Sequence, residues 1–392
     1  MVPVFLFTFI GCCLFIIYGV LIDYYRRAWT AIPVFTGNTP TGHTRISVLI
    51  PARNESVRIA SCIESLRLQT YPKHLYEVIV IDDHSTDGTS TIVQQLHYPL
   101  FTLTCLRLSE VPDQPGTVAF KKLAIETGIR AATGDLIVTT DADCQFQRGW
   151  LSTLAAFYEE KGAKFIAAPV QIGDPAAFRE PARTTFLSIF QTLDFITLQG
   201  ITGAAVHKKF HSMCNGANLA YEKRVFYEVN GFKDIDTIPS GDDMLLMHKI
   251  YNKYPDAVFF LKSPEAIVST RPETSWNGFI HQRVRWASKA DRYDDKRIFR
   301  VLLLVYILNL MFAVLAVAAC WNRRWLWLLL IGLVTKTLLE YPFVSAVARF
   351  FERDALLKWF PFLQPFHIVY TVLIGWMGKF GSYRWKDRII TK

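Results

Sequence analysis

The stretch LIVTTDAD, residues 136–143, decides how the chain folds, because an apolar, β-rich run stops abruptly at two carboxylates. A short apolar run bounded by turn-forming residues predicts a buried strand. The run EVIVI at residues 77–81 ends in the same way at Asp82 and Asp83, and a third β-rich run lies at residues 46–50. The sequence therefore predicts three buried strands, two of which end in acidic residues.

Helical patterns separate these strands. Ile59, Ile63 and Leu66 recur at helical spacing, and residues 121–132 form a second helical stretch that ends near Gly134. Alternating strands and helices predict an α/β fold with a largely parallel sheet covered by helices. Ligands of such sheets bind at the carboxyl ends of the strands, where both acidic clusters fall.

The ends of the chain hold much of its apolar material. Hydrophobic residues make up 51% of the 392, and residues 1–22, 301–320 and 359–378 contain no Asp, Glu, Lys or Arg. Each stretch is close to the ~20 residues that a helix needs to cross a bilayer. A fourth apolar stretch, residues 325–348, contains Lys336 and Glu340. These stretches predict an integral membrane protein with transmembrane helices near both termini.

We expect four regions along the chain: an anchor at 1–23, a cytoplasmic domain at 24–298, a membrane region of two to three spans at 299–378, and a basic tail at 379–392. The first stretch lacks the basic leader and small-residue cleavage site of a secretory signal peptide, which favours a retained anchor.

The net charge of +9 falls largely beside the apolar stretches. Basic residues in that position suit anionic lipid headgroups. No basic repeat interleaved with aromatic residues points to nucleic acid, so we expect a membrane partner and no nucleic acid. The seven cysteines include no C-x-x-C pair, which argues against a disulfide framework and a zinc site and fits a reducing compartment.

Acidic residues at strand ends are the remaining chemical signal, because the phosphate-loop and serine-hydrolase signatures are absent. Asp141 and Asp143 are two residues apart, so both carboxylates can face one side. They suit a hard divalent cation, Mg²⁺ or Mn²⁺, which could bridge a diphosphate. A solvated turn is the alternative interpretation.

Two further acidic positions each allow two interpretations. Asp82 and Asp83 follow an apolar strand, and a carboxylate there can accept hydrogen bonds from a nucleobase or a ribose hydroxyl, or it can close the strand in an Asx turn. Asp242 and Asp243 directly precede the apolar run at 244–250. A carboxylate there can cap a helix or deprotonate an acceptor hydroxyl.

Gln282, Arg285 and Trp286 share one face of a predicted helix, at spacing i, i+3 and i+4. Gln282 provides an amide, Arg285 a guanidinium that can bind phosphate through two hydrogen bonds, and Trp286 a flat ring on which a sugar can stack. A helix lying on the membrane, with Arg and Trp at headgroup level, is a compatible alternative.

Four elements in this order resemble the membrane-bound, inverting family 2 glycosyltransferases: IDDHS (81–85), DAD (141–143), SGDD (240–243) and QRVRW (282–286). That branch includes cellulose, chitin and hyaluronan synthases and lipid glycosyltransferases. The resemblance covers about residues 45–300. It implies a GT-A fold with a mixed, mostly parallel sheet, a nucleotide-sugar donor that is usually linked to UDP, and Mg²⁺ or Mn²⁺.

The resemblance also implies roles for single residues. It assigns Asp83 to the nucleoside, Asp141 and Asp143 to the metal and diphosphate, and Asp243 to the catalytic base. The other donor-side residues are Pro51, Ala52, Asn54, Glu55 and Lys121, and the diphosphate and acceptor side comprises Gly216, Asn218, Asp242, Gln282, Arg285 and Trp286. Two features depart from the family pattern. Phe120 stands where the family often has glycine, and GDD replaces the E-D pair of cellulose synthases while keeping the final Asp.

The acceptor class stays open at this point. A processive polysaccharide synthase fits the Q-x-x-R-W element, but four apolar segments are few for a polymer channel, which favours a lipid or lipid-linked acceptor over a free glycan. A transporter, or a scaffold with an inactive transferase domain, is the non-enzymatic alternative. Its support is the Lys336 and Glu340 pair inside an apolar stretch, although an i, i+4 pair can satisfy itself locally.

The catalytic domain is expected on the cytoplasmic side of a bacterial inner membrane. Arg26 and Arg27 follow the first apolar stretch and no basic residue precedes it, in agreement with the positive-inside tendency. If all four stretches crossed the bilayer, the basic tail would lie outside. We therefore expect one C-terminal segment, 359–378, to be re-entrant or interfacial.

The tail is accordingly predicted to lie on the same side as the catalytic domain. In sealed inside-out vesicles, added protease should cleave at Lys386, and in right-side-out vesicles the site should be protected. Cleavage at Lys386 only from the outer face would contradict this topology.

Overall fold

The computed structural model describes residues 2–37, 39–40, 43–98, 101–110, 119–173, 185–238, 241–288, 295–381, 383–385 and 388–390. It divides into two compact units. The helical unit comprises Met1–Ala31, Arg183–Ala204 and Glu273–Lys392, and the sheet unit comprises Ile32–Ala182 and Ala205–Pro272. The expected continuous domain over 24–298 is therefore interrupted, because residues 183–204 and 273–298 group with the helical unit.

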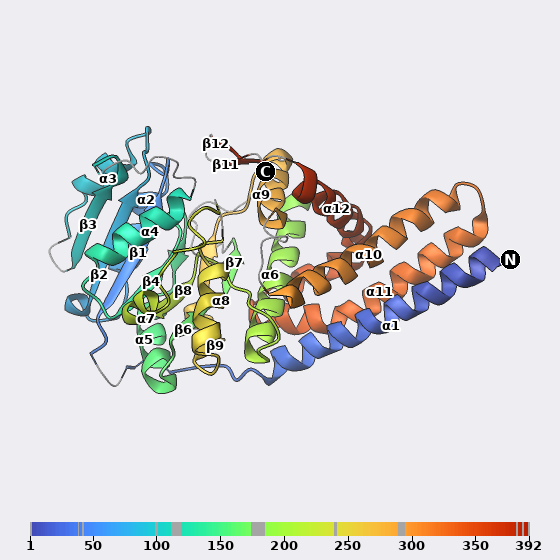
Figure 1. The fold of residues 1–392 in the computed structure, drawn as a ribbon, viewed down its shortest axis with the longest axis horizontal. Helices are drawn as coiled ribbons and strands as arrows, with labels where there is room; N and C mark the ends of the chain where they lie inside the picture. Colours follow the sequence, from blue (N-terminus) through green and yellow to red (C-terminus); the bar gives the residue numbers. More distant parts are fainter. Residues whose placement is uncertain are drawn as a thin grey trace. The chain divides into compact units, whose positions relative to one another are not determined.

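A seven-stranded sheet, ordered β3-β2-β1-β4-β8-β6-β9, forms the centre of the sheet unit (Figure 1). Its strands are β1 (Ile46–Ala52), β2 (Tyr76–Asp82), β3 (Thr102–Arg107), β4 (Leu136–Thr139), β6 (Phe165–Ala167), β8 (Leu219–Glu222) and β9 (Val258–Phe260). The pairs β2–β3, β1–β2, β1–β4 and β6–β9 are parallel, and β8 is antiparallel to β4 and β6. The predicted mixed, mostly parallel sheet is confirmed.

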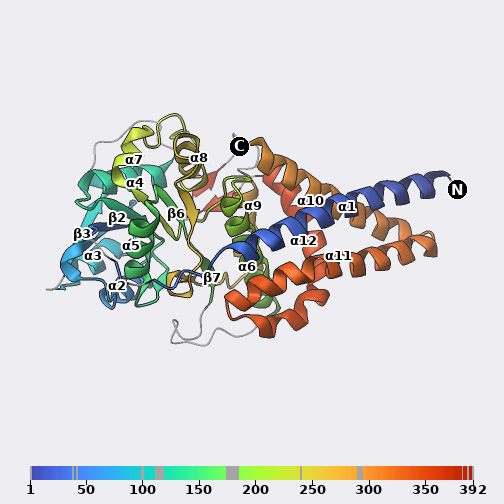
Figure 2. The ribbon, with the colours of Figure 1, turned by 90° about the horizontal axis from the view of Figure 1, so that it is seen from below.

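The three predicted strands correspond to β1, β2 and β4, and all are buried because helices cover both faces of the sheet. In Figure 2, α4 (Phe120–Ala131) and α7 (Lys223–Glu228) lie on one side of the strands, and α2 (Ile59–Arg67) and α3 (Thr89–Gln95) lie on the other. The helix predicted at 121–132 is α4. Two further helices, α5 (Trp150–Lys161) and α8 (Met244–Lys253), and a small sheet of β5 (Gln145–Phe146), β10 (Val268–Thr270) and β7 (Val170–Ile172) complete the unit.

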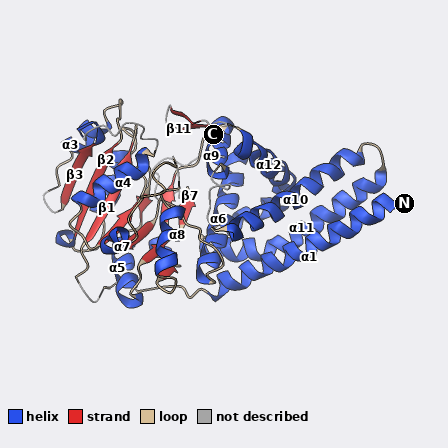
Figure 3. Cartoon of the chain, viewed as in Figure 1, coloured by secondary structure: helices blue, strands red, loops and turns tan. Residues whose placement is uncertain are grey.

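The helical unit consists of helices apart from one short hairpin (Figure 3). Its elements are α1 (Val2–Ala31), most of α6 (Phe186–His207), α9 (Trp276–Ala287), α10 (Lys296–Ala319), α11 (Arg323–Phe350), α12 (Phe360–Phe380), β11 (Tyr383–Trp385) and β12 (Arg388–Ile390). By length and composition, four helices among the described residues could cross a membrane: Phe7–Ala31, Lys296–Ala319, Arg323–Phe350 and Asp354–Phe380.

Large apolar side chains stay exposed on these four helices. Ile16 and Val20 are each 66% exposed, Leu338 is 67% exposed and Phe362 is 74% exposed. A contiguous apolar surface of this kind is unfavourable in water and suits lipid tails. The helix α12 is continuous over Phe360–Phe380. The re-entrant or interfacial placement of residues 359–378 stays a prediction, and Lys386 lies outside the described residues.

The charged pair inside the apolar stretch is satisfied within the helical unit. Lys336 Nζ lies 2.7 Å from Glu340 Oε1, one helical turn away, and donates to Gln364 Oε1 at 2.8 Å. Tyr18 on α1 donates its hydroxyl hydrogen to Glu340. The local-pair interpretation of Lys336 and Glu340 is confirmed, and the pair joins α1, α11 and α12.

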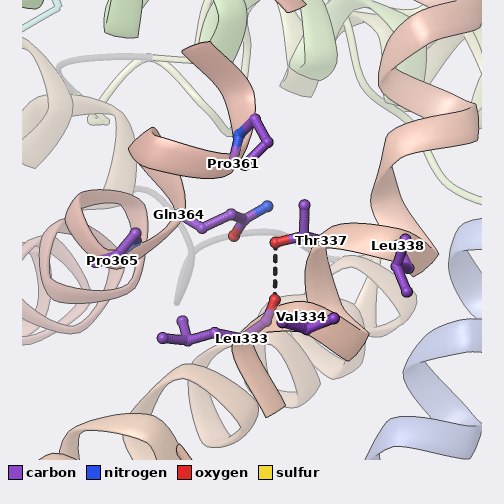
Figure 4. Close-up of a pocket in the computed structure, with 7 residues that line it drawn as sticks. All are labelled: Leu333, Val334, Thr337, Leu338, Pro361, Gln364 and Pro365. Atoms are coloured by element: carbon purple, nitrogen blue, oxygen red, sulfur yellow. Dashed lines mark hydrogen bonds between the residues drawn. The ribbon is translucent and has the colours of Figure 1, made fainter. Parts of the chain in front are cut away.

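A pocket of about 210 Å³ lies beside this pair, between α11 and α12 (Figure 4). Its lining is apolar except for Gln364 and Thr337, and the Thr337 hydroxyl donates to the Leu333 carbonyl oxygen at 2.7 Å. The pocket contains none of the predicted site residues, so it is not the predicted donor site.

Candidate active site

The parallel strands of the sheet unit bring the acidic segments to one edge. In the register, Ala52 at the end of β1 pairs with Asp82 at the end of β2, and Leu49 pairs with Thr139 at the end of β4. The segments that follow β2 and β4 carry Asp83 and Asp141. The predicted placement of both acidic clusters at the carboxyl edge of the sheet is therefore observed.

Lys121 on α4 connects two of the acidic segments. Its Nζ lies 2.8 Å from Asp141 Oδ1 and 3.3 Å from Asp242 Oδ2. Burial acts to lower the pKa of Lys121, but the carboxylates of Asp141, Asp242 and Asp243 outweigh it and hold the pKa above its usual value. The ammonium group therefore stays charged and neutralises part of the acidic cluster.

Gly216 allows the chain to approach this ion pair closely. A Cβ atom at this position would lie 3.3 Å from both Lys121 Nζ and Asp242 Oδ2. Because such a contact is tighter than side chains usually accept, a larger residue at position 216 would push on the cluster. The structure thus brings four predicted site residues together: Gly216, Lys121, Asp141 and Asp242.

Asp243 caps helix α8. Its Oδ1 accepts a hydrogen bond from the Met244 backbone N–H at 2.7 Å, and its Oδ2 accepts one from the Gly216 N–H at 3.2 Å. The capping interpretation is confirmed. These two hydrogen bonds hold the Asp243 carboxylate beside Gly216 at the start of α8. Ser240, the first residue of the SGDD element, lies outside the described residues.

Asp143 has oxygen and thiol neighbours. Thr270 donates to its Oδ2 at 3.4 Å, and the Cys144 Sγ lies 3.8 Å from its Oδ1. Burial, reinforced by the nearby Asp143 and Asp141, raises the pKa of the Cys62 thiol, and the same causes raise that of Cys144. Protonated thiols are poor metal ligands, so the donors in this place are hard oxygens.

Asp141 and Asp143 are the predicted ligands of a divalent cation at this edge. Among the residues that the structure describes, no group of three or more His, Cys, Asp or Glu side chains could hold an ion. Two carboxylates, Asp141 and Asp143, suit Mg²⁺, which commonly takes one or two carboxylates and completes its shell with phosphate oxygens and water. The donor set therefore fits a cation that arrives with a diphosphate.

The nucleoside-side residues form a second hydrogen-bonded group, after β1 and β2. Asp83 is buried, with His84 Nδ1 3.0 Å from its Oδ1 and Arg53 Nη1 at 3.8 Å. The Ser85 N–H donates to Asp82, so Asp82 rather than Asp83 closes the strand end. Asn54 has a φ of 52° and accepts a hydrogen bond from the Thr86 N–H at 2.9 Å.

The other predicted donor residues border this group. Pro51 and Ala52 end β1, and the Ala52 carbonyl oxygen accepts from the Asp83 N–H at 2.8 Å. Glu55 is largely buried and lies 3.2 Å from Arg58 Nη1. The contacts of Asp83, Asn54 and Ala52 tie the loops after β1 and β2 into one rigid edge.

Asn218 lies in the buried core of the sheet unit. It is fully buried, and its Nδ2 donates to the carbonyl oxygens of Pro169 and Ala266, each at 2.8 Å. Its Oδ1 accepts from the Trp150 indole N–H at 3.1 Å. These internal partners show a structural role for Asn218, and its expected acceptor-side role stays a prediction.

Gln282, Arg285 and Trp286 lie on α9, a helix as predicted, in the helical unit. Sequence reasoning missed their neighbour Arg283, which is buried, stacks on Trp286 and pairs with Asp194 of α6. The spacing of Phe279, Arg283 and Trp286, at i−4, i and i+3, was the available signal for the stacking.

A family model described as Glycosyl transferase family 2 matches residues 47–228. These residues include the strand ends that carry Asp83, Asp141 and Asp143, together with Lys121 and Gly216.

Known proteins with a similar sequence are glycosyltransferases. Glycosyltransferase AglE of Haloferax volcanii is 33% identical over 130 residues, which are 33% of this chain and 40% of that protein. Beta-monoglucosyldiacylglycerol synthase of Synechocystis sp. is 28% identical over 131 residues, which are 33% of this chain and 26% of that protein. The match therefore spans less than half the length of either relative.

A solved structure with the same fold is the mannosyltransferase PcManGT from Pyrobaculum calidifontis, in complex with GDP-Man and Mn²⁺. It superposes with a TM-score of 0.60 and 19% identity, over 95% of this chain and 97% of that one. The similarity confirms the predicted GT-A-like fold of the transferase domain.

Asn218→Ala should destabilise the fold without weakening donor binding. The substitution leaves the Trp150 N–H and two carbonyl oxygens without their partner, at a cost of roughly 2–3 kcal/mol for the buried groups. The unfolding temperature should fall, and donor KM, measured well below that temperature, should stay unchanged. An unchanged unfolding temperature with a raised acceptor KM would support the acceptor-side role of Asn218.

Proposed function

We propose that the chain is a membrane-bound, inverting glycosyltransferase that moves a sugar from a nucleotide sugar, UDP-linked, to a lipid or lipid-linked acceptor. The supporting observation is the contact of Lys121 with Asp141 and Asp242, next to Asp243, at the carboxyl edge of a family 2 domain. A cluster of carboxylates around one lysine suits a metal diphosphate and a hydroxyl that must lose a proton.

The donor lies across the carboxyl edge in this proposal. The nucleoside meets the loops after β1 and β2, where Asp83 offers acceptor oxygens for a base N–H or a ribose hydroxyl. Pro51, Ala52, Asn54 and Glu55 shape the same edge. Asp141 and Asp143 would hold a divalent ion here, beside the Lys121 ammonium. Such an ion would supply positive charge that neutralises the leaving diphosphate.

Asp243 is the proposed general base. Its hydrogen bonds to Met244 N–H and Gly216 N–H fix the carboxylate in one orientation. A carboxylate held in this way takes the proton of the acceptor hydroxyl as the hydroxyl oxygen attacks the anomeric carbon. Attack from the face opposite to the departing diphosphate inverts the configuration of that carbon.

Activity should depend on a divalent cation. After exhaustive chelation the transfer rate should fall to background, and Mg²⁺ or Mn²⁺ should restore it, because Asp141 and Asp143 are hard oxygen donors. The measurement is the rate of nucleoside diphosphate release against free metal concentration. Full activity in the chelated protein would remove the metal from the proposal.

Asp243→Asn should keep donor binding and lose transfer. The amide preserves the shape of the side chain but cannot take a proton at neutral pH, and the loss of a general base costs about 10²–10⁴-fold in rate. Asp143→Asn is the matched comparison and should weaken metal and donor binding as well. If Asp243→Asn instead raises donor KM at unchanged kcat, the assignment of the base is wrong.

The acceptor is proposed to arrive from the membrane. Within the helical unit, α9 packs on the candidate span α12: Val284 clusters with Ile374, and Gly378 allows close approach to Ala287. The Q-x-x-R-W residues Gln282, Arg285 and Trp286, which the family resemblance assigns to the diphosphate and acceptor, thus sit on a helix that contacts a membrane helix. The diacylglycerol-linked product named for the Synechocystis relative supports the same acceptor class.

A processive polysaccharide synthase is the second candidate, on the Q-x-x-R-W element alone. The four candidate spans found among the described residues favour single transfer to a lipid over export of a polymer. For location, we propose the bacterial inner membrane with the transferase domain cytoplasmic, since nucleotide sugars are made there. The anchor is proposed at 1–23 and the C-terminal membrane region at 299–378.

The lipid tail of the acceptor should matter for rate. One acceptor headgroup is compared with and without its tail, at subsaturating concentration, in the presence of vesicles. Transfer to the tailed form should be at least tenfold faster, because the bilayer concentrates it beside α9. Equal rates for the two forms would remove the case for a membrane-delivered acceptor.

A further inference from the structure

The side chain of Arg283 is held on three sides inside the helical unit. It is 2% exposed, and its guanidinium lies 5.0 Å from the ring centre of Phe279 and 4.3 Å from that of Trp286. These residues stand at i−4 and i+3 on α9, so all three share one helix face. The guanidinium plane therefore covers one side of the Trp286 ring.

The third side is a charge from another helix. Arg283 Nη2 lies 3.0 Å from Asp194 Oδ2 on α6, and both side chains are nearly inaccessible. The next residue, Phe195, also contacts Trp286, with ring centres 5.9 Å apart. Helix α6 thus restrains Trp286 in two ways: Asp194 holds the Arg283 side chain against it, and the ring of Phe195 contacts it directly.

A third helix reaches the same carboxylate. His367 Nε2 on α12 lies 3.8 Å from Asp194 Oδ1, and Phe190 of α6 packs on Phe279 and Tyr370. Asp194 therefore lies where α6, α9 and α12 meet. A displacement of α6 or α12 would therefore move Arg283 and, with it, the ring of Trp286.

The ion pair is a poor choice for stability alone. Among the described residues, Arg283 Nε, Nη1 and Nη2 and Asp194 Oδ2 have no well-aligned hydrogen-bond partner. Buried charges with incomplete hydrogen bonding are commonly no more stable than apolar residues of the same volume. Because Leu and Met could fill this space, stability does not account for a charged pair here. A guanidinium, unlike Leu or Met, can stack on the indole ring as a flat cation.

We propose that Arg283, held by Asp194, is a positioning residue that fixes the ring of Trp286 for the acceptor. The proposal rests on the proposed function, in which Trp286 is the acceptor platform. Trp286 itself is half-buried, so its position has consequences for whatever binds against it. Arg283 acts through Trp286 and needs no contact with either substrate.

The test separates positioning from folding by removing both charges together. The double variant Asp194→Leu/Arg283→Met leaves no unpaired buried charge, so its unfolding temperature should equal or exceed that of the unaltered protein. Its kcat/KM for the acceptor should fall about tenfold through loss of the stacked cation. Its donor KM and its acceptor-independent hydrolysis of the donor should stay unchanged.

The matched control is another buried ion pair of the helical unit, Lys336 with Glu340. The variant Lys336→Met/Glu340→Leu likewise removes two buried, opposite charges. This pair contacts Tyr18 and Gln364 rather than Trp286. Its acceptor kcat/KM should stay within about twofold of the unaltered protein. Arg283→Lys is the second variant: it keeps the charge beside Asp194 without the flat face, and its acceptor kcat/KM should fall while its unfolding temperature is retained.

Three outcomes contradict the inference. A folded Asp194→Leu/Arg283→Met variant with unaltered acceptor kinetics overturns it, as does an Arg283→Lys variant with unaltered kinetics if the double variant fails to fold. An equal loss of acceptor kcat/KM in the control pair assigns the effect to the bundle as a whole. If the unaltered protein transfers no sugar, the proposed function fails, and the inference fails with it.

Discussion

The ion contact of Lys121 with Asp141 and Asp242 is the interaction on which the rest of the site depends. It joins α4, the segment after β4 and the segment before α8, three parts of the chain far apart in sequence. Carboxylates gathered in a partly buried place repel one another unless a cation lies among them. Lys121 supplies one positive charge, and a divalent ion bound at Asp141 and Asp143 would supply two more.

A capping role for Asp243 is compatible with its proposed role as the general base. Asp243 ends the loop before α8, and its two accepted hydrogen bonds fix it beside Gly216. The hydrogen bond that caps α8 therefore also orients the Asp243 carboxylate. Sequence reasoning left capping and catalysis as rivals, whereas the geometry makes them compatible.

Short apolar runs and helical spacing in the sequence predicted the strands and helices that depend on neighbouring residues. The strands before Asp83 and Asp141 followed from short apolar runs, and their convergence followed from parallel pairing, which puts carboxyl ends on one edge. Lys121 came only from the family resemblance, since a lysine in the first turn of a helix carries no signal of its own. The buried contacts of Asn218 could not be predicted, because its partners Pro169, Ala266 and Trp150 are about fifty to seventy residues away. The pairing of Asp194 with Arg283, and the membership of α6 in the helical unit, are long-range facts that no spacing reveals.

The central claim is that this chain transfers a sugar from a nucleotide sugar to a lipid, and mass spectrometry tests it most directly. The purified full-length protein is reconstituted in vesicles of bacterial lipids with Mg²⁺ and offered UDP-linked and GDP-linked sugars one at a time. The account predicts that one UDP-sugar is consumed and that one lipid class gains the mass of a single sugar residue. Consumption of none of the donors, or a product that is a soluble polymer with all lipid masses unchanged, would contradict it.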